Sequence, residues 1–176
     1  MKHSKGANTP NWDLALVCEI EGEPGLVLVE AKAHAAELKE EGKTPVQANS
    51  QNSADNDRQI RNAIAEAAEE LAVLGHATQI SADAHYQLSN RLAFTWKLAS
   101  LGVPTVLIYL GFLGDTGLGA GFRPFLSHDD WKAVLTAHAH GVGAESLFET
   151  HFVVAGTPAW VLVRSRPVLE VSPRAF

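Results

Sequence analysis

The sequence lacks the residues and runs that mark several classes of protein. Cys18 is its single cysteine, which excludes a disulfide framework and a zinc site built from cysteines. The longest apolar run, VPTVLIYLGFL at 103–113, is too short to span a bilayer. The first ten residues are polar and lack the apolar segment of a secretion signal. We therefore expect a cytoplasmic protein with no membrane partner.

The chain also lacks an excess of positive charge. Its net charge is −6, which argues against broad, non-specific binding of nucleic acid but is compatible with a local basic patch. Hydrophobic residues make up 46% of the 176 residues and charged residues 19%, so the chain can bury an ordinary core. We expect a single domain over residues 1–176.

Strand-forming residues are concentrated near the start and in the middle of the chain. Residues 12–20 and 26–32 are rich in strand formers and flank the turn-like segment EGEPG, which predicts a β-hairpin. The continuous apolar run at 103–110 follows a glycine and contains a proline near its start. Its pattern predicts a central strand buried on both faces.

Helical spacing of apolar residues appears between these strands. A polar segment at 33–56 predicts a loop with at most a short helix, and a helix follows from about residue 57 to Gly75. A second helix is expected from an Asp83 N-cap to Gly102, and a third after Ser127. Two short strands, at 151–155 and 159–165, should form a hairpin through GTP. The order predicts an α/β fold with a mixed β-sheet flanked by helices.

The first hairpin carries an acid and a base at its open end. Glu30 and Lys32 are two residues apart in a strand, so both point to the face opposite Val29 and Ala31. With a turn centred near 22–23, Asp13 falls opposite position 32 or 33. The register at 32 places Asp13 on the face of Glu30 and Lys32. The register at 33 turns it to the other face.

Asp13, Glu30 and Lys32 together suit metal-assisted chemistry. Two converging carboxylates repel each other unless a cation lies between them, and Mg²⁺ prefers such oxygen ligands. The ion would polarise a phosphoryl oxygen and lower the pKa of a bound water. A lysine beside it can orient that water or stabilise developing charge. The competing interpretation is a strand-end salt bridge that serves solubility alone.

This arrangement resembles the PD-(D/E)XK nuclease superfamily, in an uncharacterised bacterial branch. The resemblance rests on Asp13, the Glu30-Ala31-Lys32 motif, and the helices and apolar strand that follow. It implies a restriction endonuclease-like core and a magnesium-dependent nuclease that hydrolyses phosphodiester bonds. Asp13, Glu30 and the carbonyl of Ala31 would bind Mg²⁺ or Mn²⁺, and Lys32 would be the catalytic lysine. The implied partner is nucleic acid, with DNA as the first choice, and the implied assembly is a homodimer.

The second helix offers further site residues. Gln87 and Arg91 are four positions apart and therefore share one side of that helix. In the family that the chain resembles, a polar residue on such a helix often joins the active site, so these two are candidates to orient Lys32 or bind a phosphate. The alternative is that YQLSNR is a half-exposed helix face with no part in binding.

Two other functions remain open at this point. Asp13 follows Trp12 rather than proline, and only ten polar residues precede this pair. The site could therefore be incomplete, in a non-catalytic relative that acts as a binding or assembly module. An acidic protein with a glycine-rich segment, GFLGDTGLGAGF, could instead hydrolyse a small phosphorylated ligand.

Overall fold

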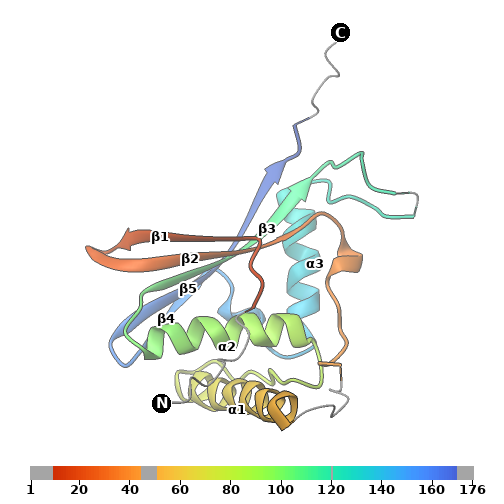
Figure 1. The fold of residues 1–176 in the computed structure, drawn as a ribbon. Coiled ribbons are helices and arrows are strands. Elements are labelled where there is room, and N and C mark those ends of the chain that lie inside the picture. The colour runs from red at the N-terminus through yellow and green to blue at the C-terminus, as the bar shows by residue number, and fades with distance from the viewer. Residues whose placement is uncertain (1–9, 45–50, 120, 170–176) are drawn as a thin grey trace.

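The computed structural model describes residues 10–44, 51–119 and 121–169, with side chains from residue 54 onward in the first long helix. Five strands, three α-helices and two single-turn 3₁₀ helices follow one another along this part of the chain (Figure 1). In chain order they are β1 (Leu14–Ile20), β2 (Glu23–Lys32), η1 (Ala35–Glu37), α1 (Gln51–Val73), α2 (Tyr86–Ser100), β3 (Thr105–Leu113), α3 (His128–His140), η2 (Glu145–Leu147), β4 (Thr150–Val154) and β5 (Thr157–Pro167).

The strands form one mixed sheet in the order β1-β2-β3-β5-β4. The central strands β2, β3 and β5 run parallel, and an antiparallel hairpin partner closes each edge. Parallel neighbours need a crossover, which the helices supply between β2 and β3 and between β3 and β5. This confirms the predicted α/β class and mixed sheet.

Both hairpins turn one or two residues earlier than predicted. Each uses a two-residue loop, Glu21-Gly22 or Ala155-Gly156, in which both residues have positive φ. That conformation matches the right-handed twist of the flanking strands. The prolines that suggested turns, Pro24 and Pro158, lie inside β2 and β5. Pro24 is tolerated because β2 pairs with β3 only from Leu26 onward.

The helix boundaries agree with the sequence pattern at most ends. Helix α1 begins at Gln51, earlier than expected, and residues 45–50 of the predicted loop lie outside the described residues. The prediction that Asp83 caps α2 is wrong, because the N-cap is His85 in a left-handed conformation (φ 46°). Ser127 caps α3 as expected, since its side chain accepts from the Asp130 amide at 3.1 Å.

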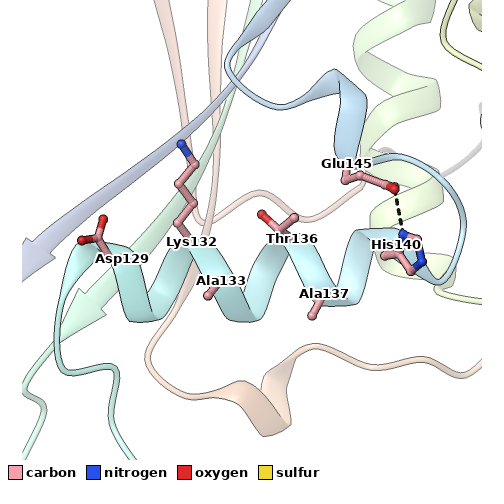
Figure 2. A pocket seen from close by; sticks show the side chains of 7 residues that line it. All are labelled: Asp129, Lys132, Ala133, Thr136, Ala137, His140 and Glu145. Carbon is pink, nitrogen blue, oxygen red and sulfur yellow. Dashed lines mark hydrogen bonds and ion pairs between the residues drawn. The ribbon is translucent and has the colours of Figure 1, made fainter.

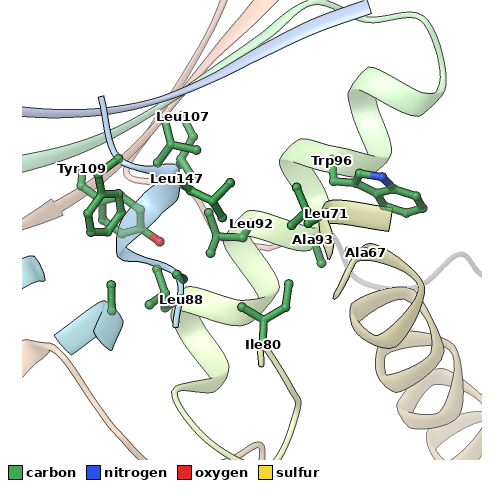
Figure 3. Packing of buried hydrophobic residues seen from close by; sticks show 14 of the residues in the cluster. Ala67, Leu71, Ile80, Leu88, Leu92, Ala93, Trp96, Leu107, Tyr109 and Leu147 are labelled. Carbon is green, nitrogen blue, oxygen red and sulfur yellow. The ribbon is translucent and has the colours of Figure 1, made fainter. Parts of the chain in front are cut away.

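The core lies between one face of the sheet and the three helices. Figure 3 shows Leu107 and Tyr109 of β3 packed near Leu88 and Leu92 of α2. Residues along β3 alternate between buried and half-buried, so the prediction that this strand is buried on both faces is wrong. Among the described residues all three helices cover the same face (Figure 1). No helix in this part of the chain is long and apolar enough to cross a membrane.

Candidate active site

Glu30 and Lys32 form a buried ion pair on β2. The Lys32 ammonium donates to Glu30 Oε1 at 2.5 Å, and the side chains of Lys32 and Glu30 are 8% and 3% exposed. They share the helix-covered face of the sheet because the strand period places residues 30 and 32 on one side. A pair this far from water does not serve as a solubilising charge at a strand end, which was the competing interpretation of the sequence.

Helix α2 brings two further donors to the same carboxylate. Gln87 Nε2 donates to Glu30 Oε1 and Arg91 Nε to Glu30 Oε2, each at 2.7 Å. Residues 87 and 91 are one helical turn apart, so both reach the same point of the sheet. The predicted site residues of α2 therefore lie at Glu30, and both of its oxygens accept hydrogen bonds.

Arg91 is fixed by contacts beyond the carboxylate. Its Nη2 donates to the Asn11 carbonyl at 2.7 Å, and its guanidinium carbon lies 4.5 Å from the centre of the Trp12 ring. Trp12 in turn packs on Phe94, with ring centres 5.8 Å apart. A planar guanidinium suits this combination of carboxylate, carbonyl and aromatic face. The segment before β1 is thus anchored onto α2.

Asp13 comes to the same end of the hairpin by a different register from the one predicted. The ladder pairs Leu14 with Val29, which places Asp13 opposite position 30 and not 32 or 33. The earlier turn at Glu21-Gly22 accounts for the shift. Asp13 is exposed, and its Oδ2 accepts from the Ala31 amide at 2.7 Å. The carboxylate therefore lies beside the Glu30-Ala31-Lys32 segment.

A cavity of about 810 Å³ opens over these residues. All five predicted side-chain positions and Ala31 line it, together with residues that the sequence did not single out for the site. The latter include Glu37, Lys39, Asn56, Tyr86 and Asn90. Burial raises the pKa of the Tyr86 phenol, so Tyr86 is a neutral hydrogen-bonding group at this wall. Asn90 lies three positions after Gln87 and four after Tyr86, so helical spacing was the available signal for both.

A layer of buried polar groups lies beneath the cavity. Tyr109 pairs with Glu30 across β2 and β3, and its hydroxyl is buried without a hydrogen-bond partner among the described residues. Burial, and then the charge of Glu30, raise the pKa of this phenol. His85 and His138 meet with their Nδ1 atoms 3.3 Å apart. Burial, followed by the nearby His85 and Lys32, lowers the pKa of His138 to about 4. The sequence pattern did not predict this layer.

The oxygen ligands near the cavity are few. Among residues 10–44, 51–119 and 121–169, no group of three or more His, Cys, Asp or Glu side chains could hold a metal ion. The cavity lining also includes the carboxylate of Glu37, but that group already accepts from the Ala33 and His34 amides. Asp13 and Glu30 remain as two carboxylates, with the carbonyl of Ala31, the residue after Glu30, as a neutral oxygen. Two carboxylates fit Mg²⁺ or Mn²⁺ in donor type, because Mg²⁺ commonly keeps several waters and takes one or two protein carboxylates.

A second cavity, of about 700 Å³, lies elsewhere and contains none of the predicted site residues. Figure 2 shows that one exposed side of α3 forms most of its wall. His140 Nδ1 lies 2.7 Å from Glu145 Oε1 at one end, and Asp129 stands at the other. Small side chains lie between the charged residues at its two ends, so few reactive groups converge in this cavity.

Comparison of the chain with protein-family models, with curated proteins and with solved structures found no match. The site must therefore be interpreted from its own geometry.

Proposed function

We propose that the chain is a metal-dependent nuclease of the PD-(D/E)XK type, with a restriction endonuclease-like core, acting on phosphodiester bonds in nucleic acid. The observation that carries the proposal is the buried Glu30–Lys32 pair at a cavity that Asp13, Gln87 and Arg91 also line. Burying a charged pair is costly, so a chain that keeps one at a cavity has a use for it. DNA is the first substrate to test.

Asp13 and Glu30, with the Ala31 carbonyl, would hold Mg²⁺ or Mn²⁺ at the cavity wall. When bound, the ion supplies a polarised phosphoryl oxygen and a water of lowered pKa. The Ala31 amide holds the Asp13 carboxylate through Oδ2, so Oδ1 would be the oxygen that binds the ion. Glu30 accepts three hydrogen bonds, so it would bind the ion through the remaining lone pair of Oε2 or after release of one donor.

Lys32 and the two α2 side chains supply positive charge and hydrogen bonds. The Lys32 ammonium, released from Glu30 Oε1, can orient an attacking water or stabilise charge on the phosphate. Arg91 can bind a phosphate through its fork of N–H donors, and Gln87 can add a neutral donor. The fixed position of Arg91 over Trp12 keeps that fork in one orientation.

One observation favours a second function, a non-catalytic binding or assembly module. Glu30 already accepts from Lys32, Gln87 and Arg91, so the charge of this carboxylate is compensated without a metal ion. A relative that had lost its chemistry would keep such a closed network for stability alone. Metal binding therefore separates the two functions more directly than cleavage does.

The first experiment measures cleavage of plasmid, single-stranded and branched DNA and of RNA, with Mg²⁺ and with Mn²⁺. Lys32→Ala should abolish cutting, because the ammonium at Glu30 is then missing. The matched control is Lys97→Ala on α2, which removes a lysine that is 45% exposed and lies outside the cavity lining. This control should cut like the wild type.

The second measurement is the melting temperature with and without Mn²⁺. An ion that binds only the folded chain raises the melting temperature, and Asp13→Ala should remove that rise. Absence of both cutting and a Mn²⁺ shift would overturn the nuclease proposal and favour the binding module. A Mn²⁺ shift without cutting of any of these substrates would exclude them and retain the metal site.

A further inference from the structure

The sheet has one face that no helix covers among the described residues. Side chains alternate between the two faces along each strand. Leu28, Leu107 and Val161 point to the helix-covered face, and the residues next to them in sequence point to the other face. We call this second set the open face, and it is represented by Leu14, Leu16, Val27, Ile108, Trp160 and Leu162. Figure 1 shows α1, α2 and α3 on the opposite side of the sheet.

The open face carries apolar residues on all five strands, with His151 of β4 as a polar residue opposite Trp160. Leu14 and Leu16 of β1 are each 48% exposed and Val153 of β4 is 45% exposed, while the central strands contribute half-buried aliphatic side chains and Trp160. An antiparallel or mixed sheet that meets water normally carries polar residues on its outer face. A continuous apolar face is instead typical of an interaction surface.

We propose that the open face is the interface with a second copy of this chain, packed sheet against sheet. Two flat aliphatic faces interdigitate well at a spacing of about 10 Å, as in β-sandwiches. The same surface on both partners is what a two-fold dimer requires. This proposal does not depend on the proposed nuclease function.

The area of the open face suits such a dimer. Five strands about 4.8 Å apart and roughly six residues of about 3.3 Å each give a face of the order of 400 Å² in projection. Protruding side chains make the accessible area larger than this projection. Two copies together would therefore bury about 1,000 Å² or more, which reaches the range of small specific interfaces. The near absence of charge at its centre matches homodimer interfaces.

Charges at the ends of the open face favour a copy of the same chain. Glu23 lies at the start of β2, and Arg166 lies near the end of β5, on the same face. Arg164, on this face as well, is already paired with Glu149 of the same chain. Because β2 and β5 both run parallel to β3, these charges mark opposite ends of the sheet. A two-fold axis between two copies can bring the acidic end of each over the basic end of the other. A nucleic acid backbone would find almost no positive charge on the centre of this face.

The strand β1 also lacks the features that protect an exposed edge. It contains no lysine or proline, its single charged residue is Glu19 near the hairpin turn, and its ladder with β2 is continuous. Natural edge strands commonly carry such features to prevent unwanted pairing. Burial of Leu14 and Leu16 in a dimer would account for their absence.

The test is the mass of the full chain in solution, measured by light scattering and sedimentation over a wide range of concentration. The wild type should have twice the single-chain mass of 18.9 kDa. Leu162→Lys and Leu16→Lys should each raise the dissociation constant about tenfold or more, because every dimer would then bury two ammonium groups. Both lysines face water in the monomer, where their long stems keep the charge hydrated.

Val17→Lys is the matched control. Val17 lies on the same strand as Leu16, is 81% exposed, and points to the opposite face, so its substitution should leave the dimer intact. A wild type that stays monomeric at the highest concentration would overturn the proposal and leave the open face to a different partner. A dimer that tolerates both lysines, or that only Val17→Lys disrupts, would overturn it as well.

Discussion

Two clusters of charged residues join the helices to the rest of the protein, and they differ in burial. The inner cluster of Glu30, Lys32, Gln87 and Arg91 links β2 to α2, with ion-pair partners that are at most 8% exposed. The outer cluster comprises Lys43, Asp57, Arg61 and Asp83. It links α1 to the loops on either side, and its side chains range from 13% to 80% exposed.

The outer cluster resembles the inner one in its chemistry but not in its surroundings. Asp57 accepts from Lys43 at 2.5 Å and from Arg61 at 2.8 Å, much as Glu30 accepts from Lys32 and Arg91. Water screens the outer ions, so they contribute little to stability. The inner ions have lost most of their hydration, so removal of one leaves buried hydrogen-bonding atoms of the others without a partner. The same contacts therefore have unequal consequences.

The largest expected difference is between Arg91→Ala and Arg61→Ala. Loss of Arg91 leaves Glu30 Oε2 and the Asn11 carbonyl without their donor, although Lys32 still compensates the charge of Glu30, and should cost about 1–3 kcal/mol of unfolding free energy. Loss of Arg61, whose side chain is 35% exposed, should cost only a small fraction of that. Urea denaturation measures both values. Equal losses of unfolding free energy in the two variants would show that burial does not make the inner cluster more important for stability than the outer one.

A smaller effect is expected from His138, next to the inner cluster. Its pKa is lowered to about 4 in the folded chain, so the unfolded chain takes up the proton first as the pH falls. The stability that the neutral side chain contributes is therefore present above pH 6.5 and is lost between pH 6.5 and about 4.

Melting temperatures across this pH range test the effect. His138→Gln should flatten the decline, because the buried titrating group is gone. His128→Gln, at the exposed start of the same helix, should keep the wild-type slope. The same slope in all three proteins would contradict the assignment to His138.

The smallest effect is expected at Asp57 in the outer cluster. Hydrogen bonds from Lys43 and Arg61 lower the pKa of this carboxyl below its ordinary value of 3.8. Its contribution to stability is therefore present above pH 3.8 and is lost as the pH falls through the lowered pKa. Asp57→Asn should reduce the loss of stability in acid slightly, and added salt should reduce the difference from the wild type. Glu66→Gln, on the exposed side of the same helix, is the control.

The sequence predicted the strands and helices more reliably than the points where they turn. The x-Gly-x-Pro pattern occurs in both hairpins, and in each the turn is made by the first two residues of this pattern and not at the proline. The shift moved Asp13 from position 32 or 33 to position 30 of the partner strand. Similarly, Asp83 is a good N-cap by residue type, yet it binds Arg61 and leaves His85 at the helix start. Local preference competes there with contacts between distant segments.

The sequence by itself determined the α/β class, the mixed sheet, and the placement of Glu30 and Lys32 on one face, because strand periodicity and apolar patterning are local properties. It also placed Gln87 and Arg91 on one side of α2. Only the tertiary structure decided that these four residues meet, that His85 faces His138, and that all three helices cover one face of the sheet. The reason is that half-buried and fully buried aliphatic strands have the same composition. The side on which each helix packs is therefore set by long-range contacts and not by the strand residues themselves.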